Sequence, residues 1–153
     1  MLNRIALTSR SMSTRTEVRV YRPDDESAVM ALWRDAFPDP APWNEPRSVI
    51  AKKLATQPDL FFVAVSEGAV VGTAMGGFDG HRGWLYTVAV RPDLRRLGIG
   101  TALVRHVEAA LETLGCSKVN LQVLASNASV VAFYARLGYA VEERVSMGKR
   151  LAS

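Results

Sequence analysis

Two glycines separated by one residue, Gly98 and Gly100, follow a pair of arginines, Arg95 and Arg96, in the stretch Arg-Arg-Leu-Gly-Ile-Gly-Thr. Glycine lets the backbone approach a ligand without a Cβ in the way, and the unpaired N–H groups of a helix N-terminus bind anions. Arginine side chains add donors for phosphate oxygens. The stretch lacks the third glycine of a dinucleotide-binding loop and the Gly-Lys-Ser/Thr of a P-loop. It therefore predicts an anion site where a strand meets a helix, and a tight turn without a ligand is the competing interpretation.

The net charge of +4 also favours anionic partners, but it does not name one. The basic residues are scattered, without a Lys/Arg run or an interleaved aromatic pattern, so we expect no nucleic-acid partner. No apolar run approaches the roughly 20 residues that cross a bilayer, so we expect a soluble protein with no membrane partner. The single cysteine, Cys116, cannot form an internal disulfide, which indicates a reducing, cytoplasmic compartment.

The chain of 153 residues has the length of one domain, which we expect to span residues 17–153. Residues 1–16 hold three arginines, several hydroxyl side chains and no acid. This composition is similar to that of an organellar transit peptide. The interpretation we favour is a flexible leader, or a start codon assigned too early with Met12 as the true start.

Hydrophobic periodicity and turn residues divide the rest of the chain into ten elements. The order is β-α-α-β-β-β-α-β-α-β, which predicts an α/β fold. We expect a mixed, mostly antiparallel sheet of about six strands, flanked by four helices on both faces, and not a doubly wound sheet. The predicted strands are residues 18–22, 60–66, 70–78, 84–90, 118–124 and 139–145, and the predicted helices are residues 24–36, 47–55, 100–114 and 127–137.

Two motifs carry a resemblance to a known family. The Arg-x-x-Gly-x-Gly loop after a Val-Ala-Val-x-Pro strand resembles motif A of the GNAT N-acetyltransferases. Residues 127–139, Asn-Ala-Ser-Val-Val-Ala-Phe-Tyr-Ala-Arg-Leu-Gly-Tyr, resemble motif B, with Ala132 one position later than usual. The motifs keep the family's order and separation, and the resemblance covers about residues 18–151. Residues 42–44, 79–83 and 148–151 are further similar to the small bacterial YpeA-type subgroup.

The resemblance implies an acetyltransferase that uses acetyl-CoA as co-substrate and no metal. An amine, on a small molecule or on a protein lysine or N-terminus, would attack the thioester carbonyl directly in a ternary complex. The chain could act alone or as a homodimer. The resemblance implies three sets of cofactor contacts: the pyrophosphate with Arg95, Arg96, Gly98, Ile99, Gly100 and Thr101, the pantetheine arm and acyl carbonyl with Val88, Ala89 and Val90, and a further contact with Asn127.

Tyr134 matches the family tyrosine that protonates the leaving thiolate. A phenol with a pKa near ~10 can do so only if it is positioned and polarised, since a thiol has a pKa near ~8.5. The competing interpretation of Tyr134 is a core aromatic residue, and that of Asn127 is a helix cap.

The general base is not apparent from the sequence. Many relatives carry a glutamate just before the Val-Ala-Val strand or in the following strand. This chain has no acidic residue at the first position and has Gln122 at the second. His81 has a suitable ordinary pKa and is the base we predict, with Asp79 and Glu142 as alternatives. Three aromatic residues could line an acceptor pocket, although packing roles explain each of them as well: Trp43, Trp84 and Tyr86.

The missing glutamate leaves a second function open. The chain could be an acyl-CoA-binding sensor, or another non-catalytic module, that holds the cofactor without turnover.

Overall fold

The computed structural model describes residues 15–152, which form two compact units, residues 15–121 and residues 122–152. The predicted leader, residues 1–16, lies almost entirely outside the described residues. The first unit contains the sheet, and the second contains the motif at residues 127–139.

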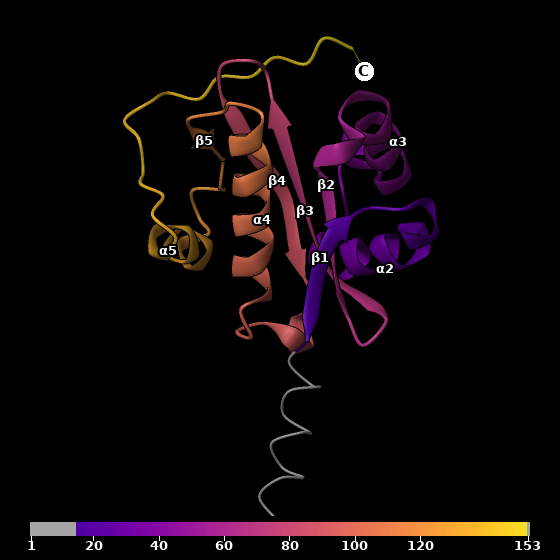
Figure 1. The fold of residues 1–153 in the computed structure, drawn as a ribbon. Helices are drawn as coiled ribbons and strands as arrows, with labels where there is room; N and C mark the ends of the chain where they lie inside the picture. The colour runs from indigo at the N-terminus through magenta and orange to yellow at the C-terminus, as the bar shows by residue number, and fades with distance from the viewer. Residues whose placement is uncertain (1–14, 153) are drawn as a thin grey trace, which may run out of the picture. The chain divides into compact units, whose positions relative to one another are not determined.

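The sheet of the first unit is mixed and mostly antiparallel, as predicted (Figure 1). Its strand order is β1-β2-β3-β4-β5, so that each strand lies beside the next in the chain. The three pairings from β1 to β4 are antiparallel, and β5 runs parallel to β4. The strands are β1 (Thr16–Val20), β2 (Phe61–Ser66), β3 (Ala69–Phe78), β4 (Gly83–Val90) and β5 (Val119–Asn120).

Both hairpin turns follow from local residue chemistry. Glu67 and Gly68, between β2 and β3, have φ angles of 51° and 77°, which suits the tight turn of a right-twisted hairpin. Between β3 and β4, Asp79 Oδ1 accepts hydrogen bonds from the backbone N–H groups of His81 (2.8 Å) and Arg82 (2.7 Å). An aspartate that bonds its own backbone two residues later is a common way to close such a turn.

Three helices of the first unit cover the two faces of this sheet. They are α2 (Glu26–Ala36), α3 (Pro46–Thr56) and α4 (Ile99–Thr113), and short 3₁₀ turns precede or follow them: η1 (Pro23–Asp25), η2 (Pro42–Asn44), η3 (Pro58–Leu60) and η4 (Pro92–Leu94). In Figure 1, α4 lies on one side of the strands, and α2 and α3 lie together on the other side.

Side chains along β3 point alternately to the two faces of the sheet, and their contacts show that α4 lies on one face and α2 on the other. A Cβ on Gly76 would lie 2.8 Å from Val107 of α4, so glycine lets α4 approach the sheet closely there. Thr73, three residues earlier, points to the other face and bonds Trp33 of α2. The core on the α2 and α3 face consists of buried apolar side chains: Tyr21, Val29, Leu32, Trp33, Ile50, Phe61, Val63, Met75 and Ala89.

The second unit contains α5 (Ala128–Arg136) and the segment that follows it. Tyr134 is its one buried aromatic residue, and its ring packs edge to face against Phe133 (5.0 Å between centroids) and Tyr139 (5.6 Å). Gly138 ends the helical turn with φ of 98°, a conformation that glycine adopts readily.

Two of the predicted strands are wrong: one is absent, and the other is much shorter than predicted. Residues 139–145 form no strand: Val141 and Val145 are 87% and 88% exposed, and the N–H of Arg144 donates to Glu142 O in a local turn. Residues 118–124 keep only the two residues of β5. A strand needs a neighbouring edge to pair with, which an alternating sequence pattern cannot supply. The described residues therefore contain five strands, not six, together with the four predicted helices.

None of the helices in residues 15–152 is long and apolar enough to cross a bilayer.

Candidate functional site

The outer edge of β4 is unpaired over most of its length. Only Gly83 and Trp84 pair with β5, so residues 85–90 have no strand partner on the side away from β3 within the described chain. Backbone donors and acceptors on such an edge are available to an extended ligand with amides of its own. Val88, Ala89 and Val90, the predicted pantetheine contacts, all lie on this open stretch.

A bulge interrupts β4 at the start of the predicted contact residues. Ala74 alone separates the β3 residues Thr73 and Met75, while two β4 residues, Thr87 and Val88, lie opposite it. Thr87 has φ of 52°, which is uncommon for a β-branched residue and persists only where surrounding contacts hold it. A bulge of this kind bends the strand and changes the direction in which its peptide groups point.

A buried hydrogen-bond chain holds the bulge. The indole N–H of Trp33 donates to Thr73 Oγ1 at 2.9 Å, and the Thr73 hydroxyl donates to the carbonyl oxygen of Thr87 at 3.2 Å. Thr73 is fully buried and Trp33 is 3% exposed, so neither partner can use water instead. Helix α2 therefore fixes the backbone of β4 through one hydroxyl group.

Replacing Thr73 by valine keeps the shape of the side chain and removes that hydroxyl. The indole N–H and the Thr87 carbonyl then lose their partner, and we expect the free energy of unfolding to fall by about 1–3 kcal/mol in urea denaturation. The control is Thr113→Val, whose hydroxyl bonds its own helix at an exposed site and should cost less than about 0.5 kcal/mol. Equal losses in the two variants would show that the chain through Thr73 contributes nothing to stability.

The predicted anion loop lies between β4 and α4. Two left-handed residues shape it, Arg96 with φ of 67° and Gly98 with φ of 83°. A Cβ on Gly98 would meet nothing within 4 Å, so backbone conformation and not space favours glycine at this position. Arg95 and Arg96 are exposed.

The first turn of α4 fits a pyrophosphate. Gly98 is the N-cap and supplies no side-chain cap, and the turn carries no acidic residue. The first N–H groups of a helix have no acceptor within the helix, and the helix dipole adds positive potential there. Asp93, the acid in η4, is engaged by Arg91 at 2.7 Å. The residues from Arg95 to Thr101 thus combine unpaired donors with two cations.

The second unit contains the other two predicted residues, Asn127 and Tyr134. Asn127 precedes α5 in the N-cap position, but its side chain makes no cap bond and instead accepts a hydrogen bond from Ser129 Oγ at 3.2 Å. Burial raises the pKa of the Tyr134 hydroxyl to about 12. That hydroxyl therefore stays protonated at physiological pH, as a hydrogen-bond donor must.

His81 lies in the exposed turn between β3 and β4. From Gly83 to Val88 the strand advances five residues, which is roughly 17 Å at about 3.3 Å each. The structure does not bring His81 to the open stretch of β4. Asp79 shares the same turn, and its hydrogen bonds to the Arg82 and His81 amides lower the pKa of its carboxyl, which leaves it a weak base.

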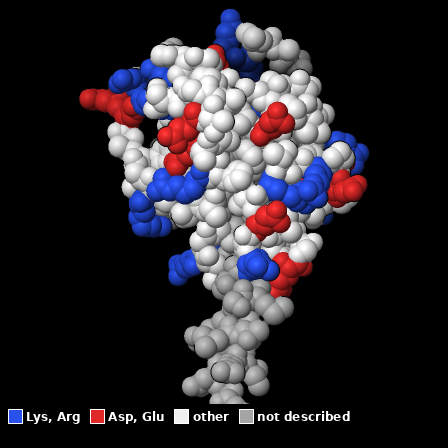
Figure 2. Space-filling view, in the orientation of Figure 1, with Lys and Arg blue, Asp and Glu red and all other residues white. Residues whose placement is uncertain are grey.

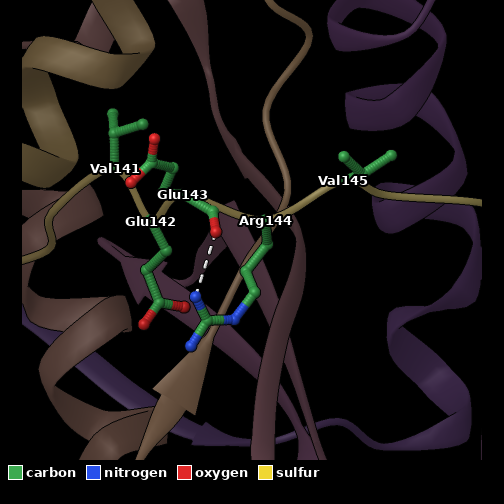
Figure 3. Close-up of a pocket in the computed structure, with 5 residues that line it drawn as sticks. All are labelled: Val141, Glu142, Glu143, Arg144 and Val145. Carbon is green, nitrogen blue, oxygen red and sulfur yellow. Dashed lines mark hydrogen bonds between the residues drawn. The ribbon is translucent and has the colours of Figure 1, made fainter.

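Glu142 lines a shallow hollow in the second unit (Figure 3). Five consecutive residues, from Val141 to Val145, form all of it, and the Arg144 guanidinium donates to the carbonyl oxygen of Glu143 at 3.0 Å. Apart from Glu142, which is only an alternative for the base, no predicted site residue lines this hollow. The hollow is formed by a bend in a single exposed segment, so we do not assign it as a substrate site.

A buried lysine is the feature that sequence reasoning missed. Lys53 of α3 is 6% exposed, and its ammonium donates to Gly76 O of β3 and, at 2.6 Å, to Tyr86 Oη of β4. Tyr86 is one of the aromatic residues that could line an acceptor pocket, whereas no sequence motif points to Lys53. The available signal was its spacing: Lys53 follows Ile50 by three residues and so shares the buried face of the helix.

The aromatic residues considered for an acceptor pocket differ in surroundings. Trp43 lies in η2 and is 51% exposed, and Tyr86 is 39% exposed. Trp84 is on the same side of β4 as Tyr86, and its indole contributes to lowering the pKa of the Asp79 carboxyl. Figure 2 shows basic and acidic side chains intermingled over the face in view.

Comparisons with known proteins identify a family for this chain. A model of the family described as "Acetyltransferase (GNAT) family" matches residues 27–139. An acetyltransferase of Pectobacterium atrosepticum is 43% identical over 137 residues, covering 88% of this chain and 95% of that protein. An acetyltransferase of Sodalis glossinidius is 45% identical over 138 residues with the same coverage.

The fold also matches a solved structure, an aminoglycoside N-acetyltransferase, AAC(6′)-Iy, in complex with CoA. The TM-score is 0.74 at 18% identity, over 90% of this chain and 96% of the other. The family match over most of the chain and the identity to named acetyltransferases lead to one conclusion: the chain belongs to the GNAT family of acetyltransferases and is an acyltransferase.

Proposed function

We propose that the protein moves an acetyl group from acetyl-CoA to a primary amine by direct attack in a ternary complex. The proposal rests on one observation: two backbone sites of the first unit follow each other directly in the chain. The open stretch of β4, residues 85–90, runs through η4 into the uncapped first turn of α4. One short segment thus offers backbone amides for a pantetheine arm and donors for a pyrophosphate.

In this proposal Arg95 and Arg96, with the N–H groups of Gly98, Ile99, Gly100 and Thr101, bind the pyrophosphate. Backbone groups of Val88, Ala89 and Val90 bind the pantetheine arm, and an N–H beside the bulge polarises the acyl carbonyl. Asn127 makes a further contact with the cofactor. These assignments rest on the motif resemblance and on the open edge and uncapped helix described above.

The reaction needs two proton movements. The protonated amine must lose one proton to attack and a second from its nitrogen after the C–N bond forms. The C–S bond then breaks, and CoA leaves as a thiolate that takes up the second proton. We assign Tyr134 as the hydrogen-bond donor to that sulfur. Because its pKa is about 12, full proton transfer to a thiolate with a pKa near ~8.5 is uphill, and donation of a hydrogen bond is the role its pKa supports. His81 stays a prediction for the base, although the strand distance favours an ionisable group nearer Val88.

The test is release of free thiol from acetyl-CoA in the presence of amines of different classes. The panel contains an aminoglycoside, because the CoA-bound structural neighbour is an aminoglycoside N-acetyltransferase, together with spermidine and a peptide with a free N-terminus. We expect one class to raise thiol release well above hydrolysis without an amine, with the acetylated product confirmed by mass spectrometry.

A second outcome supports the alternative function. Tight acetyl-CoA binding by calorimetry, combined with hydrolysis-level thiol release for every amine, would identify an acyl-CoA-binding module without turnover. The absence of a carboxylate on β4 is the observation that favours this alternative.

A further inference from the structure

A lysine and a tyrosine meet on the face of the sheet that α2 and α3 cover. Lys53 Nζ contacts Gly76 O and Tyr86 Oη, and it lies 5.0 Å from the centre of the Tyr86 ring. Lys53 is buried, whereas Tyr86 is 39% exposed. The phenol therefore lies between a buried amine and the solvent.

The lysine has no carboxylate partner. No acidic side chain within residues 15–152 ion-pairs with Lys53, and a buried cation without one is costly. Burial alone lowers its pKa, to about 8. The elements packed against α3 carry few charges, and none of them contacts Lys53: Glu26, Arg34 and Asp35 on α2, Asp59 on η3, and Arg47 and Lys52 on α3 itself.

The Lys53–Tyr86 pair can hold its shared proton in two ways. A charged Lys53 donates to the phenol oxygen, and the phenol O–H then donates to Gly76 O at 3.3 Å. A neutral Lys53 accepts the phenol O–H instead, across the same 2.6 Å contact. Burial raises the pKa of Tyr86 and lowers that of Lys53, so the proton stays on the phenol when Lys53 is neutral. In that state the amine lone pair is ready to accept a proton.

The pair is also near the proposed reaction. Tyr86 lies two residues before Val88, about 7 Å along the strand, and its ring is on the face away from α4. Tyr86 is the one titratable side chain of β4. It thus lies on the open stretch of β4, five residues nearer to Val88 than His81 is.

We propose that Tyr86 and Lys53 form the proton acceptor for the attacking amine, an inference that rests on the acetyltransferase function proposed above. The Tyr86 hydroxyl takes a proton from the substrate ammonium and passes its own proton to neutral Lys53 Nζ. The amine then attacks, and Lys53 returns its proton to solvent through the same hydroxyl. Tyr86 touches the substrate, and Lys53 is the positioning residue behind it.

The pH dependence of kcat/KM for the best aliphatic amine of the panel tests the relay. Lys53 is charged below about pH 8 and cannot accept a proton, so the wild-type rate should rise with pH through that value and then level off. In Lys53→Met and Tyr86→Phe this rise should disappear, and kcat/KM at the pH of the wild-type plateau should fall about 100-fold. The KM for acetyl-CoA should not change. Lys52→Met, the exposed neighbour, is the control.

Lys53→Arg separates a proton relay from a structural or purely electrostatic role. Arginine keeps the positive charge and the donors, but it cannot be deprotonated in a protein. The relay requires Lys53→Arg to be as inactive as Lys53→Met. A wild-type pH profile in Lys53→Arg, or a rise that persists in Lys53→Met, would overturn the proposal.

Hydroxylamine as acceptor sharpens the test, because it is already neutral at pH 7 and needs no base before it attacks. Its acetylation should hardly change in Lys53→Met. An equal loss with both amines would point to damage at the acyl site and overturn the relay.

A titration independent of turnover completes the experiment. The chain has four lysines, so ¹³C-lysine NMR can follow each one, with Lys53 identified by its absence in Lys53→Met. We expect Lys53 to titrate near pH 8, apart from the others, and its midpoint to move in Tyr86→Phe. Titration together with the other lysines would overturn the inference. If no amine in the panel were acetylated, the proposed function would fail while this titration still decided whether Lys53 can take a proton from Tyr86.

Discussion

Replacing Tyr134 by phenylalanine is expected to lower kcat with every acceptor by about 10²–10⁴-fold, while acetyl-CoA binds as tightly as before. The hydroxyl is the only group removed, and its hydrogen bond forms only as the sulfur gains charge, so it acts on the transition state and not on the bound cofactor. Thiol-release kinetics and calorimetry with acetyl-CoA measure the two quantities.

The neighbouring tyrosine provides the matched control. Tyr139 packs edge to face on Tyr134 at 5.6 Å, and Tyr139→Phe should keep near wild-type turnover. With a pKa of about 12, Tyr134 is protonated throughout the working range, so its loss should lower the whole pH profile without shifting it below pH 9. Wild-type kcat in Tyr134→Phe would remove this residue from the mechanism.

Replacing Gly98 by aspartate is expected to weaken acetyl-CoA binding about 10- to 100-fold relative to replacing it by asparagine, or about 1.4–2.7 kcal/mol. The two side chains have the same shape. Both tolerate the left-handed conformation at Gly98, where φ is 83°, and both cap helices well. The difference between the variants is therefore the negative charge placed where the pyrophosphate would bind.

Ionic strength provides a further check on the Gly98 pair. The gap between the aspartate and asparagine variants should narrow as salt is added, because mobile ions screen the repulsion at this exposed loop. Circular dichroism establishes that both variants fold. Equal affinities for acetyl-CoA would show that the pyrophosphate does not bind at the start of α4.

Much of the first unit was predictable because its signals are local. The apolar stripe of residues 100–114 predicts a helix that the structure begins at Ile99, and the Glu67-Gly68 and Asp79-Gly80 pairs predict the two hairpin turns. Turn and helix signals of this kind act within a few residues, and they do not depend on the rest of the fold.

The predictions that failed depend on distant partners. Residues 139–145 alternate like a strand, yet Val141 and Val145 remain exposed, since pairing requires a second edge. The bulge at Thr87 also lacks any glycine or proline signal. A hydroxyl on β3 and an indole on α2 hold it, at positions 14 and 54 residues away in the chain.

The sequence by itself determined the family, the order of most elements and the loop from Arg95 to Thr101, because each depends on residues that are adjacent in the sequence. Only the tertiary structure decided that, within residues 15–152, β4 keeps an open edge from residue 85 onward and that Trp33 and Thr73 hold its bulge. It also decided that Lys53 is buried against Tyr86. These features arise from packing between segments far apart in the chain, and the pKa of Lys53 follows from that burial and not from its neighbours in sequence.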